Sequence, residues 1–241
     1  MTRALAIVLL GLAACLPAHA GGEAAPAERT PVPAAPAADS AACPDPATIV
    51  RDLQTRYDTT RDFRADFRQT TTVAALGASE EAHGTVAFKK PGMMRWEYAA
   101  PEAQTIVSDG SMLWIHQPAE RQVLTAPFRA AFVSTTPISF LTGVGRITDD
   151  FRPAADARGC TAKRLHVRLV PKNEQDLGSL TLAVARASAD IVEAAITDPI
   201  GNVTTLAFAD QRRNVDIPDA EFAFVVPPGT DVVRAPGAAT P

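Results

Sequence analysis

The chain has 241 residues, of which 46% are hydrophobic and 21% charged, so it can bury a sizeable core and is not disordered as a whole. Its formal net charge of −4 lacks the basic excess that is typical of nucleic-acid-binding domains. The longest apolar run, residues 4–16, is shorter than the roughly 20 residues that a membrane-spanning helix needs, which excludes a polytopic membrane protein.

Residues 1–20 are typical of an export signal. Arg3 supplies the positive charge, residues 4–12 form the apolar segment, and Ala18-His19-Ala20 is a small-residue cleavage site. We therefore expect cleavage after Ala20 and a periplasmic protein. The sequence Leu12-Ala13-Ala14-Cys15 offers an alternative, because it is similar to a bacterial lipobox, and a lipidated Cys15 would anchor the protein to a membrane.

Residues 21–42 are rich in alanine and proline and cannot form a core, so we expect a disordered linker there. The folded domain is expected over residues 43–235, and a disordered tail over residues 236–241. Cys43 and Cys160 remain after either kind of processing and lack the spacing of a redox or metal site. In an oxidising compartment we expect them to form a disulfide, with two buried free thiols as the alternative.

The domain is predicted to begin with a helix over residues 46–58, since Asp45 can cap it, Pro46 suits its first position, and apolar residues recur at helical spacing. Beyond it, apolar and polar residues alternate with the period of a strand, and turn signals separate the segments. Strands are expected around residues 63–67, 86–88, 94–98, 105–107, 112–115, 122–124, 163–170, 179–185, 191–197, 203–209 and 222–226. About ten or eleven antiparallel strands with a few helices predict a strongly curved sheet or an open barrel.

Residues 126–151 interrupt the strand pattern, and residues 126–145 are the part that we expect to cover the sheet. Prolines and glycines divide them into two short apolar pieces, which we expect to be short helices that lie across the sheet as a mobile lid. The apolar side chains of this predicted lid are Phe128, Phe132, Ile138, Phe140 and Leu141.

Few residues indicate catalysis. His83, His116 and His166 are isolated on predicted strands, without a second ligand at metal-binding spacing. The sequence also lacks a nucleophile elbow and a phosphate-binding glycine loop. We therefore expect neither an enzyme nor a bound cofactor or metal.

Apolar side chains are frequent on the predicted strands: in residues 92–98 one face carries Met94, Trp96 and Tyr98, and in residues 112–116 both faces are apolar. An antiparallel sheet with one solvated face should be polar on that side, so these strands need a cover on each face. Two interpretations stay open: a two-layer core beneath residues 126–145, or a cavity for a hydrophobic ligand, to which flexible methionines are suited.

The segment from Gly84 to Tyr98, GTVAFKKPGMMRWEY, resembles the signature of the LolA family of periplasmic lipoprotein carriers, and so does its continuation to Trp114. Residues 63–70, 198–208 and 222–229 are similar to other strands of the family, so the resemblance spans roughly residues 45–233. It implies a mainly β fold (α+β), an unclosed antiparallel β-barrel with an N-terminal helix and lid helices over an apolar cavity.

The resemblance also implies a function. Such a chaperone accepts lipoproteins by their acyl chains from an inner-membrane ABC transporter and delivers them to an outer-membrane receptor. We expect a monomer that binds no nucleic acid. A lipid or glycolipid shuttle and a lipoprotein-sensing regulator on the same scaffold are the alternatives.

We expect eight apolar residues to line the cavity: Phe67, Phe88, Met94, Trp96, Leu113, Ile115, Leu182 and Phe208. In the family, a basic residue directly before the proline of the signature, commonly arginine, holds the lid shut. The matching residue here is Lys90, which lacks the planar fork of arginine. A solvated charge at a hairpin is the alternative role for Lys90.

Overall fold

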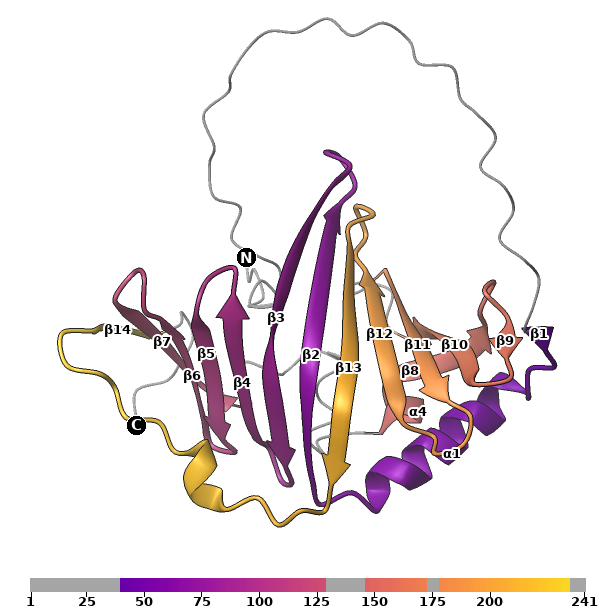
Figure 1. The fold of residues 1–241 in the computed structure, drawn as a ribbon, viewed down its shortest axis with the longest axis horizontal. Coiled ribbons are helices and arrows are strands. Elements are labelled where there is room, and N and C mark those ends of the chain that lie inside the picture. The colour runs from indigo at the N-terminus through magenta and orange to yellow at the C-terminus, as the bar shows by residue number, and fades with distance from the viewer. Residues whose placement is uncertain (1–39, 129–145, 173–177, 235–241) are drawn as a thin grey trace, which may run out of the picture.

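The computed structural model describes residues 40–128, 146–172 and 178–234. Twelve of the strands in these residues form one sheet in the order β14-β7-β6-β5-β4-β3-β2-β13-β12-β11-β10-β8 (Figure 1). Their bounds are β2 Asp62–Val73, β3 Ala78–Lys89, β4 Met93–Ala100, β5 Gln104–Asp109, β6 Met112–Gln117, β7 Gln122–Pro127, β8 Phe151–Ala155, β10 Arg164–Pro171, β11 Ser179–Ala185, β12 Ile191–Thr197, β13 Val203–Arg213 and β14 Asp231–Arg234. The two remaining strands, β1 Ser40–Ala41 and β9 Cys160–Thr161, pair with each other.

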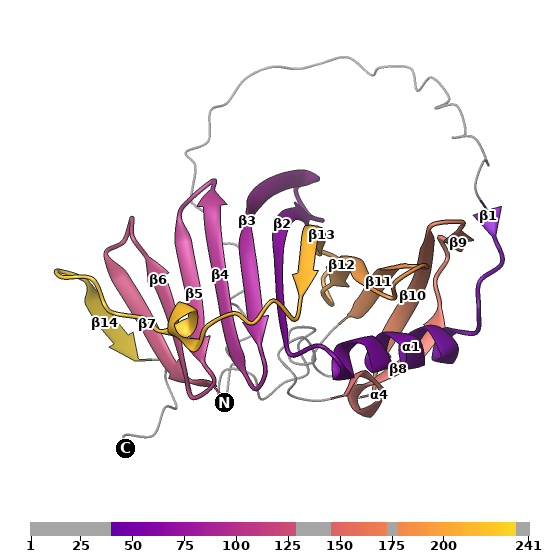
Figure 2. The ribbon, with the colours of Figure 1, turned by 60° about the horizontal axis from the view of Figure 1, so that its bottom comes forward.

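The large sheet consists of two meanders, β2 to β7 and β8 with β10 to β13, which are joined where β13 pairs with β2. All neighbours are antiparallel except β14, which runs parallel to β7. In the described residues the end strands β14 and β8 do not pair with each other, and the sheet is curved but unclosed (Figure 2). The prediction of a mainly β, unclosed antiparallel sheet is thus confirmed.

Helix α1 spans Pro46–Asp58, the range predicted from the sequence. It begins at the expected cap, because the Asp45 side chain accepts a hydrogen bond of 2.8 Å from the Ala47 N–H. Its apolar stripe, which includes Val50 and Leu53, is buried against β8 and β10 at one end of the sheet (Figure 1). None of the helices in the described residues is long and apolar enough to cross a membrane.

We call the face of the sheet that α1 covers the inner face. Beneath the helix, β8, β10, β11 and β12 contribute the apolar side chains of one core cluster. The strands β2 to β7 contribute a second cluster on the same face, and Phe208 of β13 packs against both. The apolar face therefore continues across the sheet beyond the part that α1 covers.

The outer face of β3 to β6 is covered by the chain that follows β13. Ile217 and Phe222 pack against Ala87, and Phe224 stacks on Trp114 with ring centroids 6.1 Å apart. This segment includes the 3₁₀ turn η2 (Asp219–Phe222) and runs along the lower edge of the sheet to β14 (Figure 1). It supplies the second cover that the two apolar strand faces require.

The strand predicted over residues 222–226 is therefore wrong. Phe222 and Phe224 alternate as in a strand, but both insert into the outer face of the sheet and do not pair along an edge. Pro227 and Pro228 follow and have no N–H groups to donate to a ladder.

Cys43 and Cys160 form a disulfide, with Cα atoms 5.2 Å apart. It joins the segment directly before α1 to β9, next to the pairing of Ser40 with Thr161. The N-terminal end of the domain is thus attached covalently to its second half.

Candidate functional site

The inner face of β2 to β6, together with Leu206 of β13 and Phe128 after β7, carries a cluster that we call the aromatic cluster. Its buried members are Phe63, Ala65, Phe67, Val86, Phe88, Met94, Trp96, Ile106, Leu113, Ile115, Phe128 and Leu206. The strand register explains why they meet: Phe88 pairs with Phe63 and Met94, and Val86 pairs with Ala65 and Trp96. Paired residues of neighbouring strands point to the same face, so these side chains form rows across the sheet.

Six of the eight residues predicted to line a cavity belong to this cluster: Phe67, Phe88, Met94, Trp96, Leu113 and Ile115. Phe208 packs against its edge, whereas Leu182 lies in the other cluster, beneath α1. In the structure the aromatic rings contact one another, and the Phe67 ring stands edge-on to Trp96 at a centroid distance of 4.9 Å. Whether this cluster opens into a cavity stays a prediction.

Gly84 occupies a gap in the rows of side chains. It lies between Phe67 of β2 and Tyr98 of β4 in the register, and it has no side chain to separate them. The rings of Phe67 and Tyr98 consequently approach to 4.9 Å. The first residue of the family-like signature therefore allows an aromatic contact across three strands.

Further along the same strands, the inner face becomes polar. We call Gln69, Thr71, Tyr98 and Thr204 the polar band. The Tyr98 hydroxyl donates to the Gln69 side chain at 3.0 Å, and the two threonine hydroxyls lie 3.5 Å apart. Gln69, Thr71 and Thr204 are buried, and burial raises the pKa of Tyr98. The sequence contained a signal for this band, because the alternation through Phe63, Ala65 and Phe67 places Gln69 and Thr71 on the same face.

Lys90 lies in the turn between β3 and β4, where it contacts α1. Its ammonium group donates to the Tyr57 carbonyl, in the last turn of the helix. This position favours a cation, because the C-terminal end of a helix carries partial negative charge. Burial lowers the pKa of Lys90, and the nearby Asp58 carboxylate opposes that shift.

The predicted lid lies mostly outside the described residues, and this applies to Phe132, Ile138, Phe140 and Leu141. Phe128 is described: it is buried in the aromatic cluster, and its N–H donates to the Ser111 carbonyl at 2.8 Å. A contact between Lys90 and the predicted lid stays a prediction. Among the described residues, the Lys90 ammonium group contacts α1, and its backbone N–H donates to the Arg61 carbonyl at 2.9 Å.

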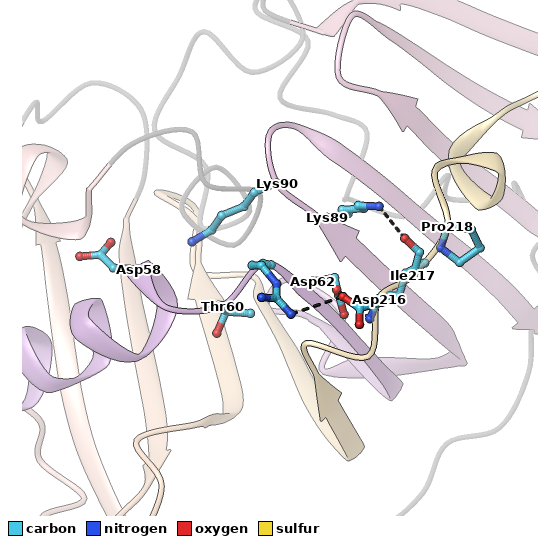
Figure 3. A pocket seen from close by; sticks show the side chains of 9 residues that line it. Asp58, Thr60, Asp62, Lys89, Lys90, Asp216, Ile217 and Pro218 are labelled. Atoms are coloured by element: carbon cyan, nitrogen blue, oxygen red, sulfur yellow. Dashed lines mark hydrogen bonds and ion pairs between the residues drawn. The ribbon is translucent and has the colours of Figure 1, made fainter.

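A pocket of about 410 Å³ lies beside Lys90, between the end of α1, the start of β2 and the chain after β13. Figure 3 shows Lys90 extending from the β3–β4 turn toward the side where Asp58 lies. The lining includes the charged residues Asp58, Arg61, Asp62, Lys89, Lys90 and Asp216. Such a lining does not suit acyl chains, so this pocket is distinct in chemistry from the aromatic cluster.

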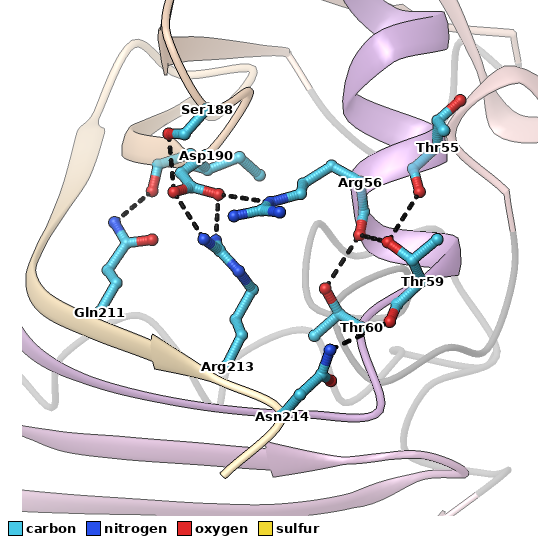
Figure 4. Close-up of polar contacts among 10 residues, drawn as sticks. Thr55, Arg56, Thr59, Thr60, Ser188, Asp190, Gln211, Arg213 and Asn214 are labelled. Carbon is cyan, nitrogen blue, oxygen red and sulfur yellow. Dashed lines mark hydrogen bonds and ion pairs between the residues drawn. The ribbon is translucent and has the colours of Figure 1, made fainter.

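A partly buried ion-pair network holds the C-terminal end of α1 (Figure 4). Asp190 accepts from Arg213 at 2.8 Å, from Arg56 of α1 at 3.0 Å and from the Ser188 hydroxyl at 2.7 Å. Although desolvation alone would raise it, the pKa of Asp190 is lowered by the hydrogen bonds from Arg213, Ser188 and Arg56. Sequence reasoning missed this network, because Arg56 and Asp190 are 134 positions apart in the chain.

The structure does not bring the three histidines together. His83, His116 and His166 lie on β3, β6 and β10, and His166 Nδ1 is 2.6 Å from the Gly159 carbonyl oxygen. Within the described residues, His, Cys, Asp and Glu side chains form no group of three or more that could hold a metal ion. The apolar inner face is therefore the stronger candidate for a functional site.

The fold and site define a class of protein: an unclosed, barrel-like sheet with an aromatic inner face and a helix across one end. Comparison with known proteins places the chain more narrowly. Residues 58–225 match the model of the family "Outer membrane lipoprotein carrier protein LolA". The chain belongs to the LolA family.

Relatives support this assignment over most of the chain. An outer-membrane lipoprotein carrier protein of Chromobacterium violaceum is 34% identical over 83% of this chain and 94% of its own. One of Methylobacillus flagellatus is 31% identical over 76% of this chain and 88% of its own. The solved structure of a LolA superfamily protein from Nitrosomonas europaea covers 74% of this chain and 97% of its own, with 13% identity and a TM-score of 0.41.

Proposed function

We propose that this protein is a periplasmic carrier of lipoproteins, which covers their acyl chains between the inner and the outer membrane. The observation that carries the proposal is the match to the lipoprotein carrier family over residues 58–225. The aromatic cluster supports it, because these side chains form a continuous buried apolar cluster on one face of an unclosed sheet. No catalytic step is part of this function.

The physical requirement is to shield hydrocarbon from water and still release it. Each buried CH₂ group contributes about 0.8 kcal/mol, so a lipoprotein with several acyl chains does not cross an aqueous compartment unaided. An apolar face binds such chains without directional contacts, and a moving cover governs their release. The protein would be exported, cleaved after Ala20, and act as a soluble monomer that takes cargo from an ABC transporter and delivers it to a receptor.

Lys90 is the residue that we expect to control release. Its hydrogen bond to the Tyr57 carbonyl links the β3–β4 turn to α1, and so links the two halves of the inner face. A hydrogen bond to a charged group contributes about 1.5 to 3 kcal/mol, which shifts a closing equilibrium by roughly tenfold or more. We propose that this bond favours the closed, empty state that drives delivery.

The test is a two-step transfer assay: release of a tagged lipoprotein from inner-membrane vesicles, followed by delivery to outer membranes. Wild-type protein should complete both steps. Lys90→Leu should keep its fold and its uptake but deliver about tenfold more slowly. Lys90→Arg should retain delivery, because arginine donates to the same carbonyl and can bind a second acceptor.

Lys163→Leu is the matched control, since Lys163 is an exposed lysine that directly precedes β10, in the other meander. It should behave as the wild type in both steps. If Lys90→Leu delivered lipoprotein at the wild-type rate, Lys90 would have no role in release and would be only a charged residue at the surface. Failure of the wild type to release any lipoprotein from the vesicles would refute the carrier function itself.

A further inference from the structure

The indole N–H of Trp96 is a buried donor without an acceptor. Trp96 is only 1% exposed, and its Nε1 has no hydrogen-bond partner within the described part of the chain. Most buried polar groups are hydrogen-bonded, because leaving one unpaired costs about 1 to 3 kcal/mol. Such a donor in an otherwise apolar cluster calls for an explanation.

Aromatic rings surround this indole. Phe67 and Phe88 stand edge-to-face to it, at centroid distances of 4.9 and 5.7 Å, and Tyr98 stacks beside it at 6.4 Å. A ring face is at most a weak acceptor for an N–H group. Phenylalanine at position 96 would fill much of the same apolar space without the unpaired donor, so packing alone does not account for tryptophan here.

The polar band lies directly beyond this indole, and some of its amide and hydroxyl donors make only long hydrogen bonds. In the register, Trp96 is followed on β4 by Tyr98 on the same face, which pairs through Gly84 with Phe67, and Gln69 is the next inner residue of β2. The Gln69 amide nitrogen reaches Thr71 only at 3.4 Å, and the hydroxyls of Thr71 and Thr204 are 3.5 Å apart. Both contacts are long for hydrogen bonds and leave capacity for a better acceptor.

The absence of charged side chains in the aromatic cluster and the polar band indicates which kind of ligand group these donors would bind. The members of the aromatic cluster and of the polar band are all uncharged. Glu80, which pairs with Thr71 in the register, is acidic and would repel a phosphate. A neutral carbonyl oxygen matches these donors, since it accepts from indole, amide and hydroxyl groups without needing a counter-charge.

We propose that Trp96 and Gln69 form a carbonyl-binding site on the inner face, which receives the ester or amide oxygen at the head of an acyl chain. This inference rests on the proposed carrier function and deepens it. The hydrocarbon lies over the rows of Phe63, Phe88 and Met94, and the carbonyl lies at the boundary between the aromatic cluster and the polar band. The site thus fixes the direction in which a chain enters.

The experiment compares two probes with the same hydrocarbon: a didecanoyl glycerol with ester carbonyls, and the didecyl ether glycerol without them. The full-length purified protein is titrated with each probe. The wild type should bind the ester probe about three- to tenfold more tightly than the ether probe, as one to two added hydrogen bonds predict. Trp96→Phe should bind both probes with affinities close to that of the wild type for the ether.

Two further variants keep the test decisive. Gln69→Leu should also reduce the preference for the ester, and it replaces Trp96→Phe if that protein does not fold. Trp114→Phe is the control: Trp114 stacks on Phe224 at the outer face, so the preference should persist. Equal binding of the two probes by the wild type would overturn the carbonyl site and leave the carrier function standing, whereas binding of neither probe would overturn both.

Discussion

At the scale of single residues, Gly84 shows how closely neighbouring strands approach. A Cβ atom on Gly84 would lie 1.8 Å from the Glu97 carbonyl oxygen, where the pairing of β3 with β4 shifts its register. Backbone is on the other side of the contact, so no side-chain rotation can relieve it. We expect Gly84→Ala to lower the free energy of unfolding by about 3 kcal/mol, measured by chemical denaturation.

Gly159 provides the control for this substitution. It has a positive φ of 66° but nothing within 4 Å of an added Cβ atom, so Gly159→Ala tests backbone conformation without steric contact. Gly159→Ala should lower the free energy of unfolding by about 1 kcal/mol. If Gly84→Ala were no more destabilising than Gly159→Ala, the close approach at Gly84 would not matter for stability.

Among the secondary-structure elements, α1 depends on a polar attachment as well as on its apolar stripe. Asp190 is the acceptor for both Arg56 and Arg213, and Arg213 is largely buried. Asp190→Asn would leave this arginine without its counter-charge, so we expect a loss of about 2 to 3 kcal/mol in the free energy of unfolding at pH 7. Asp52→Asn, at an exposed ion pair on α1, should cost less than 1 kcal/mol in the same measurement.

The same network predicts a pH dependence. Because the pKa of Asp190 is lowered in the folded state, its carboxylate stabilises the protein above the unfolded-state pKa of about 3.9. This contribution is lost as the pH falls through the lower, folded-state pKa. Denaturation curves from pH 7 to pH 2 should therefore show a smaller acid-dependent loss for Asp190→Asn than for the wild type. Parallel curves for the two proteins would contradict the assigned role.

Elements with strong local signals were predictable from the sequence. Helix α1 has a cap and a helical period, and the ten strands β2 to β7 and β10 to β13 alternate between turns. The strands β8 and β14 lacked such signals, because β8 is five residues long with an internal proline and β14 is fully exposed. Their strand conformation depends on pairing with β10 and β7.

Some features of the candidate site were likewise predictable from the sequence, and others were not. The aromatic cluster followed from alternation within each strand, whereas the placement of Leu182 under α1 depended on how the two meanders join. The carbonyl that Lys90 contacts belongs to α1, 33 positions earlier in the chain, and no local pattern indicates that contact. Helix docking and the way in which the two meanders join are tertiary properties, which the period of apolar residues within one segment does not encode.

For the molecule as a whole, the disulfide connects parts of one cooperative structure. Cys43 and Cys160 are separated by 117 positions, and a loop of that length gives at most about 4 to 5 kcal/mol from chain entropy. The two meanders share a continuous sheet through β13 and β2, so they should not unfold separately.

We expect a thiol titration of the unfolded, unreduced protein to find neither cysteine free. After reduction we expect a single unfolding transition with a lower denaturation midpoint. The free energy of unfolding should fall by about 2 to 4 kcal/mol. The double variant Cys43→Ser/Cys160→Ser should match the reduced protein and be insensitive to reductant. Two transitions after reduction would mean that the disulfide, and not the shared sheet, unites the two halves.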